Sequence, residues 1–328
     1  GRRNYAETLG SDECNGYTAL TSSAMMRAAL WTGEETLVAA ALKAVDRMTE
    51  RYRGTVPCGA QPWEMPLHTP DIVGSARLLT TYVDAYLLSN DAKYLAEANY
   101  WAWSGMTMVY LQPAPYDYDS TVANPVGLYA TCGVMGATNW TAPNWIGRPV
   151  QWCGLVYAAA LYDLARAIGA REPSRAAFWR KVADGIAASG LQQCYGEDAE
   201  PAVRGLLPDS WDFKRQTQYP VPINPGTLQE CAADAIGRPY YACVRLAADG
   251  KSPILHVPGD CAVLPSEGAE LRVRLTPWPR DGFNVCVARI ARPTAVRWNG
   301  QPVPFDWEGG VLRLKLASCP QGDLAISL

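Results

Sequence analysis

Residues 61–70, QPWEMPLHTP, place three side chains that can do chemistry close together. Trp63 offers an aromatic surface, Glu64 a carboxyl group, and His68 an imidazole, one of only two in the chain. Glu64 follows Trp63 and precedes Met65, and burial there would raise its pKa, as a general acid requires. Glycosidic bonds are usually cleaved by such an acid together with a second carboxylate. Glu64 is therefore the first candidate for a general acid.

Three other acids are candidates for the second carboxylate. Asp117 and Asp119 stand in YDYD, and Asp209 stands in LLPDSW. The carboxyls would lie ~5 Å apart in a retaining hydrolase and ~6.5–9.5 Å apart in an inverting one. Each acid also has a plain structural interpretation: Glu64 as an anchor for loop amides, the YDYD pair as surface or turn acids, and Asp209 as a cap.

A lyase would use different groups from the same region. It removes a proton beside a uronate carboxylate, so it needs a base or acid such as His or Tyr and a cation to neutralise the carboxylate. His68, Tyr129 and Arg148 fit those roles. The net charge of −3 weighs slightly against a strongly anionic polymer. His68 can also be a structural residue that bonds the turn before a helix.

The sequence contains no motif for a metal site or for a cofactor. The spacing of Glu64, His68 and Asp71 matches no dedicated zinc site, and Ca²⁺ would need more oxygen ligands. No C-x-x-C, G-x-S-x-G, G-x-G-x-x-G or P-loop occurs. We therefore expect no metal and no cofactor.

Paired helices must position these residues. Each of three repeats has an Ala-rich apolar helix, a polar turn and a more charged helix, which predicts tandem αα-hairpins. Thr69, Pro70 and Asp71 read as the N-cap and first turn of one of these helices. The expected helices cover residues 17–31, 36–52, 71–88, 95–111, 150–168 and 175–189, with a short one at 228–237.

The chain changes character twice. Residues 112–149 are rich in Pro, Gly, Tyr and Trp with few charges, which predicts a long ordered loop. From about residue 240, short alternating runs separated by Gly, Pro and Asp predict an antiparallel sandwich, with a hairpin turn at Asn299-Gly300. The expected domains are 1–238, helical, and 239–328, a β-sandwich.

The order of hairpins and then sandwich resembles the α/α-toroid carbohydrate-active enzymes, both glycoside hydrolases and polysaccharide lyases. The tail VRWNGQPVPFDWEGGVLRLKL is similar to their C-terminal sheet domains. The resemblance implies an α+β fold and an oligo- or polysaccharide ligand, and it transfers no catalytic residue. A full toroid has twelve helices, so an upstream segment or a partner chain would complete the ring. A non-catalytic glycan-binding or assembly subunit stays open as a third function.

In a toroid the connections before the inner helices meet at one end. This places residues 58–71 and 144–152 together and gathers the aromatic and polar side chains expected to bind sugar: Trp63, Tyr129, Trp145, Arg148, Gln151 and Trp152. The excess of 12 Trp and 17 Tyr over four Phe agrees with an amphipathic ligand such as a sugar.

The composition argues against nucleic-acid and membrane partners and gives evidence on the cellular compartment of the protein. Basic residues are scattered, which argues against nucleic acid, and no apolar run reaches the ~20 residues of a membrane helix. Ten cysteines, an even number, are compatible with disulfides in a secreted, periplasmic or cell-surface protein. Reduced buried cysteines are the alternative. The chain starts without Met, which we interpret as processing or truncation.

Overall fold

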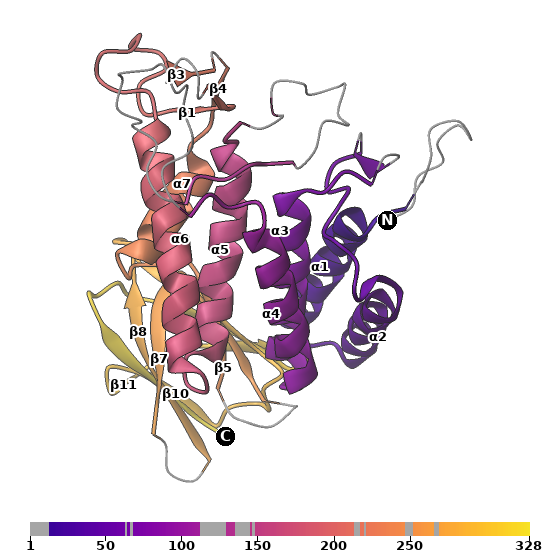
Figure 1. The fold of residues 1–328 in the computed structure, drawn as a ribbon. Coiled ribbons are helices and arrows are strands. Elements are labelled where there is room, and N and C mark those ends of the chain that lie inside the picture. The colour runs from indigo at the N-terminus through magenta and orange to yellow at the C-terminus, as the bar shows by residue number, and fades with distance from the viewer. Residues whose placement is uncertain are drawn as a thin grey trace. The chain divides into compact units, whose positions relative to one another are not determined.

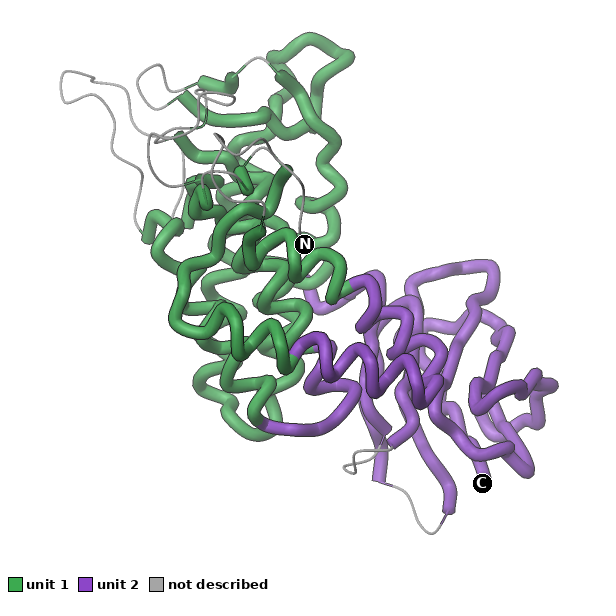
Figure 2. The backbone as a smooth tube through the Cα atoms, turned by 90° about the vertical axis from the view of Figure 1, so that its right-hand side faces the viewer, with its two compact units in different colours: residues 1–23, 46–83, 93–235 green, residues 24–45, 84–92, 236–328 purple. Residues whose placement is uncertain are grey.

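The computed structural model (Figure 1) divides into two compact units, coloured in Figure 2. Unit 1 comprises residues 1–23, 46–83 and 93–235, and unit 2 comprises residues 24–45, 84–92 and 236–328. The second unit thus includes parts of four helices as well as the C-terminal strands. The structure describes residues 13–62, 64–65, 68–111, 129–134, 145, 148–212, 217–219, 221–246, 252–265 and 269–328.

The described residues form seven helices, close to the expected ones. Two helices differ by several residues. α6 continues to Gln193, four residues beyond its expected end, and α4 ends at Met106, because the chain then turns and Val109 pairs with Thr131 in a β-bridge. In unit 1, α5, α6 and α7 pack against one another. The helices are α1 (Asn15–Thr32), α2 (Glu35–Tyr52), α3 (Ile72–Ser89), α4 (Ala92–Met106), α5 (Gln151–Ile168), α6 (Pro173–Gln193) and α7 (Gly226–Ala235).

Left-handed residues end the first helices of two hairpins. Gly33, with φ of 63°, follows α1, and Asn90, with φ of 58°, follows α3. Gly and Asn adopt this conformation at low cost, so they stop a helix and reverse the chain. The carboxylate of Glu34 then accepts hydrogen bonds from the backbone N–H groups of Thr36 and Leu37 and caps α2. The sequence TGEE therefore encodes both the end of α1 and the start of α2.

The start of α3 differs from the sequence expectation. The helix begins at Ile72, and Asp71 is its cap, because Asp71 Oδ1 accepts a hydrogen bond from the Val73 N–H at 2.6 Å. Pro70 and Asp71 instead form β-bridges, with Cys58 and Val134 respectively. The bridges hold the chain extended there, so the expected cap at Thr69 was wrong by two residues.

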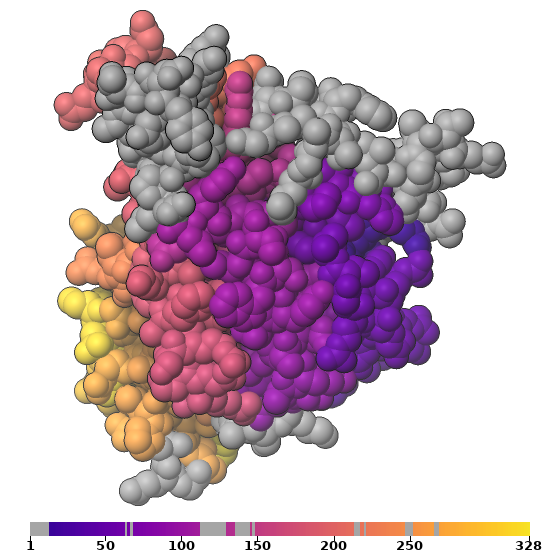
Figure 3. Space-filling view, viewed as in Figure 1, coloured from indigo at the N-terminus to yellow at the C-terminus, as the bar shows by residue number. Residues whose placement is uncertain are grey.

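Aromatic side chains join α4 to α6 within unit 1. The Trp103 ring stacks on Phe178 at 5.2 Å and meets Trp179 edge to face at 4.8 Å. Figure 3 shows both helices on one face of the unit. Trp179 is fully buried and donates its indole N–H to Asn99 at 3.2 Å. These contacts fix the α5–α6 hairpin beside α4.

Strands begin after α6. Two short ladders, β1–β4 and β2–β3, belong to unit 1, and two five-stranded antiparallel sheets with orders β11-β10-β14-β8-β7 and β12-β13-β9-β6-β5 belong to unit 2. The strands are β1 (Leu207–Pro208), β2 (Trp211–Asp212), β3 (Thr217–Gln218), β4 (Pro222–Ile223), β5 (Ala242–Arg245), β6 (Ile254–Val257), β7 (Gly259–Leu264), β8 (Glu270–Pro277), β9 (Phe283–Ala288), β10 (Ala295–Trp298), β11 (Gln301–Pro302), β12 (Asp306–Glu308), β13 (Val311–Leu316) and β14 (Gly322–Ser327).

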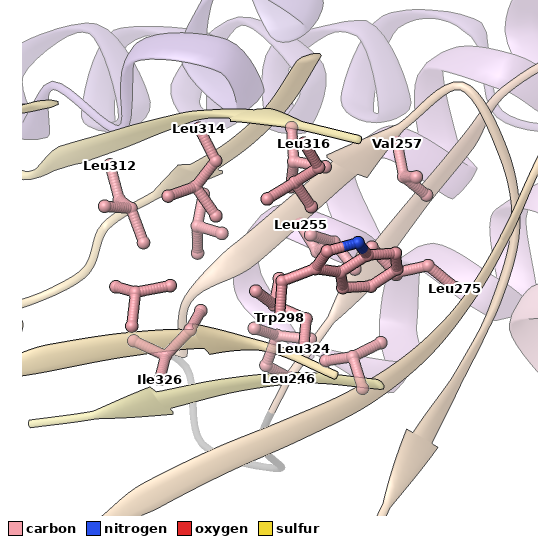
Figure 4. Packing of buried hydrophobic residues seen from close by; sticks show 14 of the residues in the cluster. Leu246, Leu255, Val257, Leu275, Trp298, Leu312, Leu314, Leu316, Leu324 and Ile326 are labelled. Atoms are coloured by element: carbon pink, nitrogen blue, oxygen red, sulfur yellow. The ribbon is translucent and has the colours of Figure 1, made fainter. Parts of the chain in front are cut away.

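The two five-stranded sheets bury one hydrophobic core between them (Figure 4). Leu312, Leu314 and Leu316 alternate along β13 and point into it, while Arg313 and Lys315 between them are exposed. Period-two alternation of this kind assigns one face of a strand to the core and the other to solvent. The expected Asn-Gly hairpin is confirmed: Asn299 and Gly300 have φ of 50° and 79° and connect the paired β10 and β11.

The ten cysteines are all free thiols, so the expectation of disulfides is not supported. Five of them are buried, in agreement with the alternative of reduced cysteines that act as small apolar groups. Among the helices that the structure describes, none combines the length and apolarity needed to cross a membrane.

A substitution in the core of unit 2 should strongly lower the free energy of unfolding. Leu324 on β14 is fully buried, so Leu324→Ala should lower the free energy of unfolding by ~2–5 kcal/mol through lost burial and a new cavity. Val263→Ala on β7 of the same sheet, where the side chain is 49 % exposed, should cost far less. Chemical denaturation of both variants checks this, and equal losses would contradict the assigned core.

Candidate active site

Three segments distant in sequence meet at the start of α3, as the sequence analysis expected. The Gly16 N–H donates to the Cys58 carbonyl at 2.9 Å, which ties the start of α1 to the segment before α3. Cys132 pairs with Pro149, just ahead of α5, and Asp71 with Val134. The starts of α3 and α5 thus share one end of unit 1 (Figure 1).

Glu64 lies in a turn in this cluster of connections. Its backbone N–H donates to the Gln61 carbonyl at 3.0 Å, and its Oε2 accepts the Gln61 N–H at 3.1 Å. The side chain has no exposed surface. Burial, followed by the nearby charge and hydrogen bond of Asp71, raises the pKa of Glu64 far above its usual range. Glu64 therefore holds a proton at neutral pH.

Asp71 is the partner of Glu64 and is also fully buried. Burial raises its pKa too, but the hydrogen bond from Glu64, the backbone N–H groups of Val73 and Gly74, and the positive charge of Arg77 all lower it. The pKa of Asp71 nevertheless stays above its usual value. Both pKa values are raised, so the pair holds a proton at neutral pH, and we assign it to Glu64 because the charge of Arg77 favours the ionised form of Asp71.

The hydrogen-bond inventory leads to the same assignment. Glu64 Oε1 and Asp71 Oδ2 are both buried and receive no hydrogen bond from an N–H or O–H of the described residues. Two ionised carboxylates would repel each other there, whereas one proton shared between them turns both oxygens into partners. The pair is therefore a carboxylic acid hydrogen-bonded to a carboxylate.

Arg77 supplies the nearest positive charge. It is the only cation in the otherwise apolar run that starts α3, and its Nη1 donates to the Ala60 carbonyl. Asp71 favours its charged form, while burial opposes it and lowers its pKa. Arg77 therefore balances the charge of Asp71 and holds the segment before Glu64 against α3.

Thiols surround the two acids. Burial raises the pKa of Cys14 to about 11 and raises that of Cys58, and the Cys14 Sγ donates to the Gly59 carbonyl at 2.8 Å. Cys153, at the first turn of α5, is fully buried, and its pKa is raised first by burial and then by Asp71, Glu64 and Asp209. These thiols are protonated at neutral pH, so they are not poised as nucleophiles.

Asp209 lies near enough to Cys153 to influence it electrostatically, and it has a structural role as well. Its Oδ2 accepts the indole N–H of Trp145 at 2.7 Å. Trp145 meets Trp152 edge to face, with the ring centroids 5.7 Å apart. Two of the expected sugar-stacking tryptophans therefore pack against each other, next to one of the expected acids.

The polar groups expected to bind a ligand have partners within the chain. Gln151 is buried; its Oε1 accepts the Thr131 N–H at 2.9 Å and its Nε2 donates to the Ile186 carbonyl at 2.8 Å. Arg148 forms an ion pair with Asp212 at 3.5 Å. These contacts tie α5 to its flanking segments, so a structural role accounts for both side chains.

Tyr129 and Thr131 lie against glycines of the helices. A Cβ on Gly185 of α6 would overlap the Tyr129 ring, and a Cβ on Gly154 of α5 would overlap the Thr131 side chain. Tyr129 adopts a φ of 63°, which a tyrosine tolerates only where its surroundings fix it. The segment 129–134 is therefore seated closely on both helices.

His68 is exposed and has a φ of 48°, so it stands at the surface beside the buried pair. Its backbone N–H donates to the Met65 carbonyl at 3.2 Å. The expected residues Trp63, Asp117 and Asp119 lie outside the described residues. No group of three or more His, Cys, Asp or Glu side chains in the described part of the chain is arranged to hold a metal ion.

Sequence reasoning assigned Asp71 to the helix start, rejected it as a metal ligand with Glu64 and His68, and did not single out Arg77 or Cys153. A usable signal for Arg77 was present, since a lone cation in an apolar helix needs a buried counter-charge. The contact between Asp71 and Glu64 had no such signal, because it depends on how the turn at residues 61–65 folds back onto the helix.

Comparisons with known proteins found distant structural neighbours. No protein-family model matches the chain, and no curated protein matches it. A solved structure described as a glycoside hydrolase aligns at 13 % identity with a TM-score of 0.33, covering 94 % of this chain and 55 % of its own. A GH127 β-L-arabinofuranosidase from Geobacillus stearothermophilus aligns at 11 % identity with a TM-score of 0.36, covering 93 % and 53 %.

A second GH127 β-arabinofuranosidase aligns at 11 % identity and a TM-score of 0.25, covering 95 % of this chain and 70 % of its own. The chain thus spans about half the length of the first two neighbours. At these TM-scores the likeness carries no argument about the activity of this protein.

The shared proton predicts a pH effect on stability. In the unfolded chain Glu64 ionises above its usual pKa of ~4.3, whereas in the fold it keeps its proton. The contribution of Glu64 to the free energy of unfolding is therefore greatest at low pH and falls as pH rises, by up to about 1.4 kcal/mol per pH unit while only the unfolded form titrates.

Glu64→Gln should remove this dependence, because an amide has no proton to release and its N–H can still donate to Asp71. Denaturation at pH 5 and pH 8 should show the variant gaining stability relative to the parent at the higher pH. Glu50→Gln, at an exposed position of α2, is the control and should follow the parent. An identical pH dependence in parent and Glu64→Gln would contradict the shared proton.

Proposed function

We propose that this protein acts on carbohydrate as a glycoside hydrolase in which Glu64 is the general acid. The observation that supports it is the fully buried Glu64 carboxyl, whose pKa is raised by burial and by the neighbouring Asp71. Cleavage of a glycosidic bond needs a carboxylic acid that still has its proton at neutral pH to give to the leaving oxygen. Asp71 and Arg77 are positioning residues in this proposal, since they set the protonation and orientation of Glu64.

The second carboxylate of the proposed reaction is not Asp71. A hydrogen-bonded carboxyl pair is closer than the ~5 Å or ~6.5–9.5 Å that leaves room for a sugar or a water. Asp209 is the best placed of the described candidates, because it is only partly buried and lies near the same thiol as the pair. Asp117 and Asp119 remain sequence-based candidates for this role.

Access to Glu64 requires a movement. Its carboxyl is fully buried, so a substrate reaches it only when the connection before α3 opens. Gly59, with φ of 63°, and His68 flank this connection and have left-handed backbone conformations that favour a sharp change of direction. Trp145 and Trp152 would then form the adjacent aromatic surface for sugar rings.

Two finer proposals complete this picture. The three αα-hairpins would be part of an α/α toroid, completed by an upstream segment or a partner chain, and the two five-stranded sheets would be a β-sandwich. Export to the periplasm, cell surface or medium remains a prediction of the sequence, and free cysteines remove the disulfide argument for it.

Glu64→Gln tests the proposed acid directly. On the polysaccharide that the parent cleaves, found by a reducing-sugar screen, the variant should lose at least about a hundredfold in kcat, because general acids contribute 10²–10⁴-fold. Folding should be kept, as judged by circular dichroism. The matched control is Glu97→Gln, another buried glutamate of unit 1, which should keep its activity. Unchanged turnover in Glu64→Gln would remove Glu64 from the mechanism.

A polysaccharide lyase is the second candidate, favoured by the exposure of His68 next to a buried acid pair. His68→Ala separates the two functions. A lyase that uses His68 should lose activity at least about a hundredfold, whereas the proposed hydrolase should change severalfold at most. Absorbance of unsaturated uronate products identifies the lyase reaction independently. Unsaturated products that vanish in His68→Ala would replace the hydrolase assignment.

A further inference from the structure

Unit 2 contains a cavity of about 930 Å³ that has no part in the chemistry proposed for unit 1. The volume lies within the ~300–1,000 Å³ range of small-molecule sites. Its walls come from the end of α1 and from the sheet β12-β13-β9-β6-β5. Side chains of that sheet which alternate away from the core reach it, so the cavity opens on the face opposite to the core in Figure 4.

One wall is an aromatic stack that includes Trp31. The Trp31 ring lies on the His256 imidazole, with the centroids 4.0 Å apart and the planes at 13°, and Tyr241 stacks beyond them at 6.1 Å from each. Trp31 nevertheless keeps 45 % of its surface exposed. A large exposed tryptophan whose one side is covered by another ring is a ready surface for a second flat ligand.

Hydrogen bonds hold the stack in place. His256 Nε2 lies 3.0 Å from the Leu30 carbonyl, which can only accept, so Nε2 carries the hydrogen. Nδ1 then accepts the hydroxyl hydrogen of Tyr241 at 2.6 Å. Burial lowers the pKa of His256 to about 4, in agreement with a neutral ring. The Trp31 surface is therefore fixed before any ligand arrives, which reduces the entropy lost on binding.

The floor and the far wall are polar. Lys315 of β13 pairs in register with Asn284 of β9, and Arg313 of β13 with Asp306 of β12, and all four side chains are exposed. Directly opposite residues in antiparallel strands lie ~4.5–5.5 Å apart, so the two members of each pair are close to each other. Together they offer hydrogen-bond donors, acceptors and an amide across the three adjacent strands β12, β13 and β9.

We propose that this cavity is a saccharide-binding site, in which one sugar ring stacks on Trp31 and hydroxyls of the bound saccharide bond the polar side chains of β9, β12 and β13. A sugar has an apolar C–H face and a hydroxylated edge, and the cavity presents one matching wall to each. The Asp306 carboxylate accepts from hydroxyls, Lys315 and Arg313 donate, and Asn284 does both. Two cations against one anion also accommodate a uronate.

The proposal rests on unit 2 alone and is tested apart from the proposed hydrolysis. Titration calorimetry of the full chain with neutral oligosaccharides and with oligogalacturonides should detect binding of at least one class. Trp31→Ala should weaken it about tenfold or more, and Trp278→Ala should not, although Trp278 is 53 % exposed in the same unit. A preference for oligogalacturonides that Lys315→Ala removes identifies an acidic sugar; equal binding of both identifies a neutral one.

Two further variants serve as controls for this test. Asp306→Ala changes an exposed side chain, so it should weaken binding even if Trp31→Ala fails to fold. Glu64→Gln should bind as the parent does, which separates this site from the proposed general acid. No binding of either class, or binding that Trp31→Ala and Asp306→Ala leave unchanged, would overturn the proposal. So would a Trp31→Ala variant that alters only the oligomeric state, because a protein surface would then cover Trp31.

Discussion

The buried contact between Glu64 and Asp71 constrains the whole end of unit 1 at which the helices α3 and α5 begin. Two carboxyl groups without solvent are unstable unless one proton, a set of backbone N–H groups and a cation compensate them. Each compensating group comes from a different place: the proton from Glu64, the N–H groups from the first turn of α3, and the charge from Arg77. The turn before α3 must therefore close onto the helix as one unit.

The same constraint explains how a fully buried carboxyl group can still have a chemical role. A buried carboxyl kept for packing alone would be replaced at little cost by an apolar or amide side chain, whereas a protonated acid beside an anion is a proton donor of defined direction. What limits it is access. The chain around it is held by β-bridges, short turns and side-chain hydrogen bonds from Cys14, Asn15 and Arg77, so opening that connection breaks several hydrogen bonds.

The helices and most strands could be predicted from local sequence, whereas the site depends on contacts between these elements. Helix periodicity and polar turns located all seven helices, and alternation from about residue 240 located the region of the two five-stranded sheets. The strands β5, β7 and β12 give no clean period, because their burial is exposed or mixed. The disulfide expectation failed because an even cysteine count does not distinguish paired thiols from buried ones.

For the site residues, too, local sequence predicts some properties, and others depend on contacts between elements. Burial of Glu64 was foreseeable from Trp63 and Met65 beside it, but its pairing with Asp71 was not, because the cap position of Asp71 depends on bridges to Cys58 and Val134 that flank it. Gln151 looked like a ligand-binding amide and instead joins Thr131 to Ile186. A polar residue at the start of a helix has the same signature in sequence whether its partner is a substrate or the backbone.

Gly154 and Gly185 have a consequence for how this region could be engineered. The absence of a side chain at these two points lets the segment 129–134 sit directly on α5 and α6. A single methyl group would press on the Thr131 side chain from Gly154, or on the Tyr129 ring from Gly185, and would act as a wedge under that segment. The seating of the segment is thus adjustable from the helix side, through two residues outside the Glu64–Asp71 pair.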